Sequence, residues 1–171
     1  MSDPRYPIGK FSFEAFRDSS ARAAAISEIR DLPKELRTAV AKRSESEIDA
    51  PYREGGWTIR QLVHHVADSH MNAFIRFRLA LTEDKPTIKP YAEAEWAKLP
   101  DSDLPLEVSL SILDNLHHRW TVMLELSPDE VFARELIHPV SGPMPLDRLL
   151  QLYCWHGKHH VAHVLHAPQA K

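Results

Sequence analysis

The sequence predicts an all-α fold, a helical bundle with irregular connections. Apolar residues recur at helical spacing along most of the chain, and proline-rich stretches separate the long periodic segments. The length of 171 residues is that of one typical domain. We therefore expect a single helical domain that spans residues 1–171.

The first helix is expected over Ser20 to Lys42, where apolar residues follow the helical period. Pro33 lies inside this stretch. Proline lacks a backbone N–H, and its ring clashes with the carbonyl group four residues earlier. The sequence therefore predicts a first helix that is broken or kinked at Pro33.

The second helix has a sharper beginning. Thr58 and Gln61 fit a capping box, in which each side chain bonds to the backbone N–H of the other residue. An apolar stripe then continues from Ile59 to Leu81 and ends at a polar run. We expect one long helix over this range.

The connection from Thr82 to Pro105 carries four prolines and no strong periodic pattern. Such a long connection is uncommon in a compact domain unless it covers something. We expect a lid or the arm of a homodimer, with Tyr91 and Trp96 as its apolar anchors.

The C-terminal part predicts two more long helices. The first covers Leu106 to Glu125. A second capping box, beginning at Ser127, predicts a short helix over roughly Pro128 to Arg134, and residues 135–144 resemble a small hairpin. The last helix begins at Pro145 and continues to about His166.

Composition excludes several classes of protein. A formal net charge of −3 lacks the basic excess of a nucleic-acid-binding surface. No apolar run approaches the roughly 20 residues that span a bilayer, and no signal peptide is visible. Cys154 is the single cysteine, which precludes an intramolecular disulfide, so we expect a reducing, cytoplasmic location.

Histidine is the unusual component, with 11 residues in the chain, most of them in two short clusters. The last helix offers two pairs at i, i+4 spacing, His156 with His160 and His159 with His163. Residues four apart share a helix face, so either pair can converge on one metal ion. His160 falls inside the apolar stripe and His156 at its edge, which favours that pair.

The third ligand is less clear. The second helix offers His64, His65 and His70. Periodicity alone favours His70, which lies near the middle of the apolar stripe, although a site at the end of a seam can take a ligand from the flank. A fortuitous or solubilising histidine tract in the last helix is the alternative to a metal site.

Four segments together resemble the YfiT-type branch of the DinB-like metal-binding bundle family. They are Gly55 to Gln61, His64 to Asn72, Thr82 to Tyr91 and Trp155 to His163. The resemblance covers nearly the whole chain. It implies an up-down-down-up four-helix bundle that binds a divalent metal, Zn²⁺ or Ni²⁺, through His65, His156 and His160.

Three imidazole ligands leave a coordination position open, as in catalytic metal sites. The resemblance therefore implies an enzyme that activates water or a low-molecular-weight thiol, such as bacillithiol or mycothiol, to attack a small electrophilic substrate. Hydrolysis and thiol S-transfer both stay open. The alternative is a metal-stabilised dimeric scaffold or stress-response binding module without catalysis.

Four further side chains are candidates for orienting a metal ligand or the nucleophile. They are His64, Asp68, Asn72 and His159. An ordinary surface role is the alternative for each.

Overall fold

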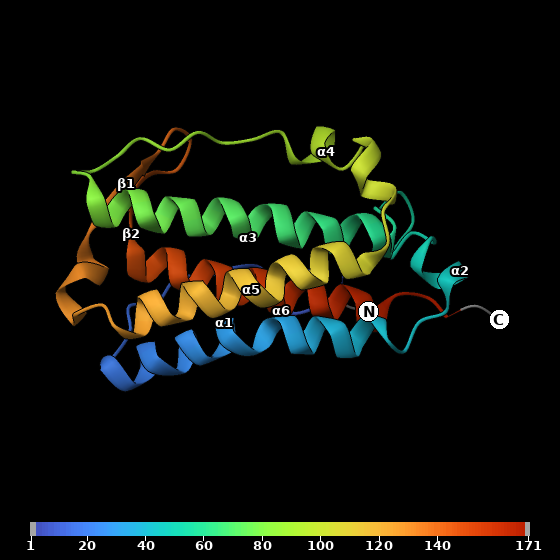
Figure 1. Ribbon diagram of the computed structural model, residues 1–171, viewed down its shortest axis with the longest axis horizontal. Coiled ribbons are helices and arrows are strands. Elements are labelled where there is room, and N and C mark those ends of the chain that lie inside the picture. Colours follow the sequence, from blue (N-terminus) through green and yellow to red (C-terminus); the bar gives the residue numbers. More distant parts are fainter. Residues whose placement is uncertain (1–2, 170–171) are drawn as a thin grey trace.

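Four long helices lie side by side in the computed structural model, which describes residues 3–169 (Figure 1). They are α1 (Ser19–Val40), α3 (Ile59–Thr82), α5 (Leu106–Glu125) and α6 (Leu146–His166). α1 and α6 run in one direction and α3 and α5 in the other (Figure 1). The expected up-down-down-up bundle is therefore confirmed.

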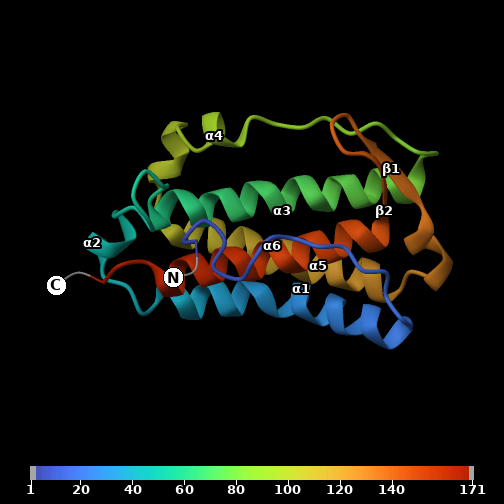
Figure 2. The same ribbon diagram turned by 180° about the vertical axis from the view of Figure 1, so that it is seen from behind.

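The order of helices around the bundle explains the long connection. α1 packs against α5 and α6, and α3 packs against the same two helices. Because α3 and α5 are parallel neighbours, the chain must return along the whole length of α3 before α5 can begin. Residues 83–105, which we call the strap, follow the outer side of α3 and include α4 (Glu93–Trp96) and the 3₁₀ helix η1 (Pro100–Asp103) (Figure 1, Figure 2).

The predicted hairpin is confirmed and anchors the strap. Its strands β1 (Glu135–His138) and β2 (Gly142–Pro145) pair antiparallel. The N–H of Ile88 donates to the carbonyl oxygen of Ile137, and the N–H of Ile137 donates to that of Pro86. The strap is thus held by backbone hydrogen bonds near the end of α3.

One of the two predicted capping boxes forms. Thr58 Oγ1 accepts a hydrogen bond from the N–H of Gln61, and Gln61 Oε1 accepts one from the N–H of Thr58, both at 3.1 Å. The predicted capping box at Ser127 was wrong. Its hydroxyl does not cap the following turn but donates to the Met123 carbonyl at 2.7 Å. The following turn is the 3₁₀ helix η2 (Asp129–Ala133) and has no side-chain cap.

The predicted break at Pro33 was also wrong, since α1 continues through it. In a regular helix the N–H of residue 33 would bond to the carbonyl oxygen of Ile29, and proline leaves that oxygen without its usual partner. Nδ1 of His117, on α5, donates to the Ile29 oxygen at 2.5 Å. A neighbouring helix therefore supplies the hydrogen bond that proline removes.

Two apolar clusters fill the bundle, one toward each end. The first includes Ile29 and Phe77, and the second includes Leu36 and Leu62. Between them along the helices lie the buried histidines His70, His117 and His160, and His65 lies among the α3 residues of the second cluster. The polar side chains of the site are thus embedded at mid-bundle, with rigid packing on either side.

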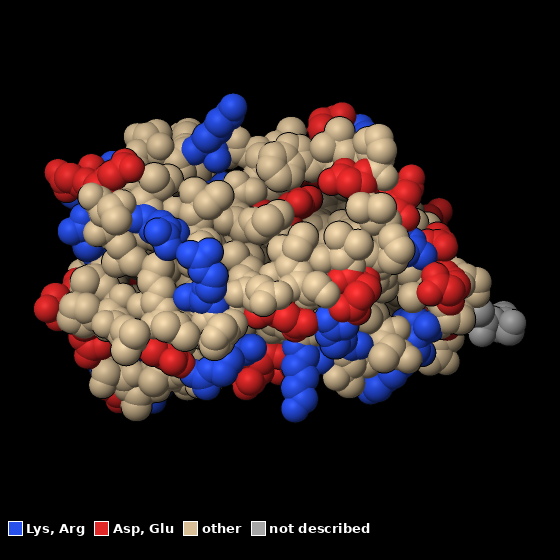
Figure 3. All heavy atoms as spheres, in the orientation of Figure 1, with Lys and Arg blue, Asp and Glu red and all other residues tan. Residues whose placement is uncertain are grey.

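Surface ion pairs link the helices from outside. Arg37 of α1 bonds to Glu107 and Asp114 of α5. Acidic and basic side chains are interspersed over the face shown in Figure 3. Among the described residues, no helix is long and apolar enough to cross a membrane.

The first testable prediction concerns Gly157, where α6 approaches α1. A Cβ atom placed there would lie 2.7 Å from a methyl carbon of Leu32, well inside van der Waals contact. Leu32 is buried, so either its side chain or the helix backbone must shift within the packed interior to admit the added atoms. We expect Gly157→Val to lower the free energy of unfolding by about 2–3 kcal/mol, as measured by urea denaturation.

The matched control is Leu165→Ala, at an exposed position of the same helix. It should change the free energy of unfolding by less than about 0.5 kcal/mol. A Gly157→Val protein as stable as the parent would show that α1 and α6 can move apart without cost.

Candidate metal centre

Three imidazole rings from two helices converge at the middle of the bundle. His65 comes from α3, and His156 and His160 come from successive turns of α6. Nε2 of His156 lies 3.3 Å from Nε2 of His65 and 3.2 Å from Nε2 of His160. One ring nitrogen from each residue lies within 4.8 Å of the other two.

These separations fit a metal ion. In a tetrahedral site with metal–nitrogen distances of about 2.0–2.1 Å, ligand nitrogens lie about 3.3–3.4 Å apart. Among residues 3–169, no cysteine or carboxylate joins these three histidines as a further candidate ligand. The donor set is thus three nitrogen atoms with an open position, which suits Zn²⁺ and other divalent transition metals.

The environment keeps these imidazoles neutral. Burial lowers the pKa of His65 to about 4. Burial, and then the neighbouring imidazoles, lower the pKa of His156 and of His160 well below the ordinary value. At neutral pH the rings therefore carry unprotonated nitrogens that can bind a metal without first losing a proton.

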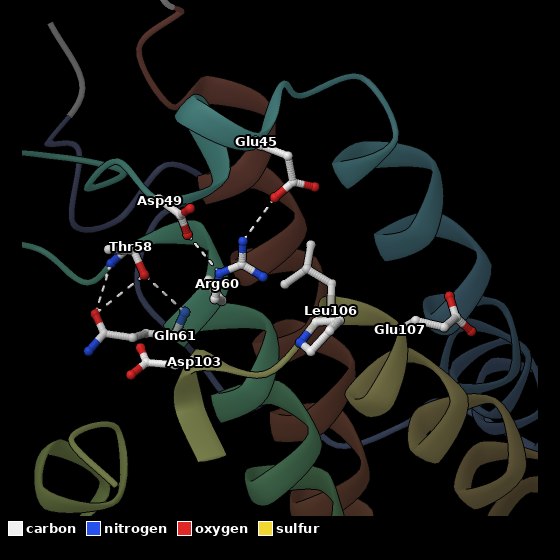
Figure 4. Close-up of a pocket in the computed structure, with 9 residues that line it drawn as sticks. Glu45, Asp49, Thr58, Arg60, Gln61, Asp103, Leu106 and Glu107 are labelled. Atoms are coloured by element: carbon white, nitrogen blue, oxygen red, sulfur yellow. Dashed lines mark hydrogen bonds and ion pairs between the residues drawn. The ribbon is translucent and has the colours of Figure 1, made fainter. Parts of the chain in front are cut away.

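The beginning of α3 determines where His65 points. The capping box at Thr58 defines the first turn of the helix, and Arg60 ties that turn to α2 (Glu45–Ile48) through Glu45 and to Asp49 directly after it (Figure 4). The ring of Trp57 packs against His65, with centroids 4.8 Å apart. A separate cavity of about 890 Å³ lies around Arg60, and none of the three converging histidines lines it.

The three histidines line a different pocket, of about 450 Å³, which opens beside α6. Tyr52, Trp57 and Trp155 provide aromatic walls, and Glu93 reaches the pocket from the strap. Arg53 adds a positive charge. The strap therefore contributes to the site, as expected of a covering segment, although Tyr91 and Trp96 pack against each other with ring centroids 4.5 Å apart.

His159 is the one proposed orienting residue that lines this pocket. Its ring stacks on Trp155 with centroids 4.4 Å apart, and its Nδ1 has no hydrogen-bond partner among the described residues. Periodicity along α6 puts His159 and His163 outside the apolar stripe, which predicts exposed side chains, but both are buried. Tyr6 and Tyr52, from segments without helical periodicity, contact their rings.

The other three candidates do not line the pocket with the converging histidines. Both ring nitrogens of His64 are engaged elsewhere, by the Ser109 hydroxyl and the Leu104 carbonyl. The Asn72 amide donates to the Asp68 carbonyl. Burial, with a smaller effect of a nearby acidic side chain, raises the pKa of Asp68 to about 6.

His70, which periodicity favoured as the third ligand, lies one layer behind the converging nitrogens. Its Nε2 contacts Nδ1 of His156 at 3.2 Å, on the opposite side of that ring from Nε2. His163 has a similar place behind His160, with their Nδ1 atoms 3.4 Å apart. Sequence reasoning considered His163 only as the i, i+4 partner of His159, and it did not single out His117, which contacts His70.

Comparison with known proteins identifies the family. Residues 28–164 match the DinB superfamily. The chain belongs to this superfamily. The YfiT-type resemblance is confirmed by YfiT from Bacillus subtilis, described as a probable metal-dependent hydrolase with an unusual four-helix bundle topology. This DinB chain superposes on it with a TM-score of 0.91 and 42% identity, over 94% of this chain and 93% of YfiT.

Curated relatives of this DinB chain agree with that likeness. A protein of Bacillus cereus strain B4264, named "Putative metal-dependent hydrolase", is 51% identical over 96% of this chain and 95% of its own length. A Bacillus mycoides protein of the same description shows the same identity and coverage. A mycothiol-dependent maleylpyruvate isomerase shares the fold, with a TM-score of 0.66 and 18% identity over 81% of this chain and 58% of the isomerase.

Proposed function

We propose that this protein is a metal-dependent hydrolase in which His65, His156 and His160 hold a divalent ion, Zn²⁺ or Ni²⁺. The observation that carries the proposal is the convergence of three neutral imidazoles on one point beside a pocket. The names of relatives that share about half of this sequence over nearly its full length support it.

The donor set determines the kind of chemistry available. Held by the neutral imidazoles of His65, His156 and His160, a divalent ion would keep its full charge and would supply Lewis-acid and water-activating chemistry near neutral pH. The chain supplies the rest. The apolar clusters keep the rings in place, and the side chain of His159 forms part of the pocket lining.

The pocket also limits the substrate. A volume of about 450 Å³ fits a small molecule rather than a folded protein. Aromatic walls favour substrates with an apolar part, and Arg53 favours one with a negative or strongly polar group. We propose a small carbonyl compound, an ester or an amide, as the substrate class.

Metal removal is the second testable prediction and the direct test of this function. Hydrolysis of a panel of activated esters and amides should disappear when the protein is stripped with a chelator. It should return when Zn²⁺ or Ni²⁺ is added. The control is circular dichroism of the stripped protein, which shows whether the bundle is still folded.

The same assay, run with a panel of small thiols, separates the other possibilities. Metal-dependent conjugation of an electrophile with a thiol, without hydrolysis, would replace the hydrolase by a thiol S-transferase. A folded, metal-loaded protein inert in both panels would favour the non-catalytic scaffold. Homodimerisation through the strap, where Trp96 and Leu99 are exposed, stays a prediction.

A further inference from the structure

A chain of hydrogen bonds crosses the bundle behind the converging histidines. It begins at the Ile29 carbonyl oxygen on α1, which contacts Nδ1 of His117 on α5 at 2.5 Å. Nε2 of His117 lies 3.0 Å from Nδ1 of His70 on α3. Nε2 of His70 lies 3.2 Å from Nδ1 of His156 on α6. Each of the four helices contributes one group.

The direction of every hydrogen bond follows from its first member. A carbonyl oxygen can only accept, so Nδ1 of His117 must carry the proton. A neutral imidazole has one N–H, and Nε2 of His117 is therefore an acceptor for the N–H at Nδ1 of His70. By the same argument Nε2 of His70 accepts from Nδ1 of His156. The unprotonated nitrogen of His156 is then Nε2, the atom that faces His65 and His160.

The surroundings of His70 and His117 keep both imidazole rings neutral. His70 is 0% exposed and His117 is 1% exposed. Neither makes an ion pair among the described residues. A buried charge without a partner is strongly unfavourable, so both imidazoles remain uncharged.

Pro33 explains why the chain can begin at Ile29. An ordinary residue at position 33 would donate its own N–H to the Ile29 carbonyl and satisfy it within α1. Proline cannot, which leaves a fixed acceptor in the core. That acceptor makes the Nδ1–H tautomer of His117 the favoured one.

We propose that His117 and His70 are positioning residues of the metal centre, which hold His156 in the tautomer and ring orientation that presents Nε2 to the ion. The inference rests on metal binding by the three histidines, as in the proposed function. Partners of this kind behind a ligand typically change metal affinity by about 10–100-fold. Neither residue touches the ion or the substrate.

The first test reads the tautomers directly. Long-range ¹H–¹⁵N correlation spectra of the metal-free protein at neutral pH should show His117, His70 and His156 protonated at Nδ1. This measurement needs no variant and no metal. Protonation of His156 or His70 at Nε2 instead of Nδ1 would overturn the proposal.

The second test measures Zn²⁺ affinity by competition with a chromophoric chelator. His70→Leu removes both hydrogen bonds while filling the space, and should weaken Zn²⁺ binding by about 10–100-fold. His70→Gln retains a donor and an acceptor and should recover most of that loss. The matched control is His64→Leu, which removes another buried, hydrogen-bonded histidine of α3 and should leave affinity within about threefold of the parent.

The outcomes separate this inference from the proposed function. An unchanged Zn²⁺ affinity in folded His70→Leu, or an equal loss in His64→Leu, would overturn the positioning role while leaving the three-histidine site intact. A parent protein that binds no Zn²⁺ would remove the metal site itself. If His70→Leu does not fold, the tautomer spectra of the parent protein still decide the question.

Discussion

His160→Ala is expected to weaken Zn²⁺ binding by about 100- to 700-fold and to abolish metal-dependent hydrolysis. Four-ligand zinc sites contribute about 10–16 kcal/mol, so each ligand accounts for about 3–4 kcal/mol, and each 1.4 kcal/mol is about a factor of ten in affinity. The chelator competition assay measures the affinity, and the ester and amide panel measures the activity.

The control for this variant is His166→Ala, which removes an exposed histidine of the same helix. It should retain both metal affinity and activity, because His166 does not line the pocket. Full Zn²⁺ retention by His160→Ala would show that this set of three ligands is wrong. Retention of metal with loss of activity would instead assign His160 a role in the reaction.

The metal-free protein is expected to unfold as the pH is lowered from about 6.5 to 4. Burial lowers the pKa of His65 and of His117 to about 4 in the folded protein, against 6.5 for an ordinary histidine. Between these values the unfolded chain binds protons that the folded protein does not, so acid favours unfolding. Each group removes about 3 kcal/mol by pH 4, from a total stability of typically about 5–15 kcal/mol.

Urea denaturation of chelator-treated protein at a series of pH values measures this effect. The pKa of His70 shifts in the same direction and steepens the loss. His117→Gln should flatten the pH dependence, whereas His118→Gln, the adjacent exposed position of α5, should leave it unchanged. A free energy of unfolding that is constant from pH 6.5 to 4 would mean that these imidazoles are solvated in the native state.

Much of the fold could be predicted because its signals are local. The capping box at Thr58 places the beginning of α3, since it depends on residues three apart. The predicted range Leu106 to Glu125 is that of α5. The capping prediction at Ser127 failed because a competing acceptor, the Met123 carbonyl, lies in the preceding turn.

Local signals were less informative about burial and about contacts between helices. Periodicity gives the angle of a side chain around its own helix, not the segment that will cover it. His159 and His163 are buried by Tyr6 and Tyr52, which belong to no long helix. For the same reason, the hydrogen bond from His117 to the Ile29 carbonyl, which replaces the one that Pro33 cannot make, could not be predicted from the sequence of α1 alone.

The sequence by itself determined the four long helices, the presence of a long connection between the second and third of them, and the i, i+4 spacing that puts His156 and His160 on one face of α6. Periodicity left the choice between His65 and His70 open and the family resemblance implied His65; the tertiary structure brings His65 together with His156 and His160. His70 lies at the centre of its apolar stripe and so faces the bundle interior, where it contacts His117. His65 lies on the flank, where α3 meets α6 beside an open pocket, and a metal site that must admit a substrate needs that position.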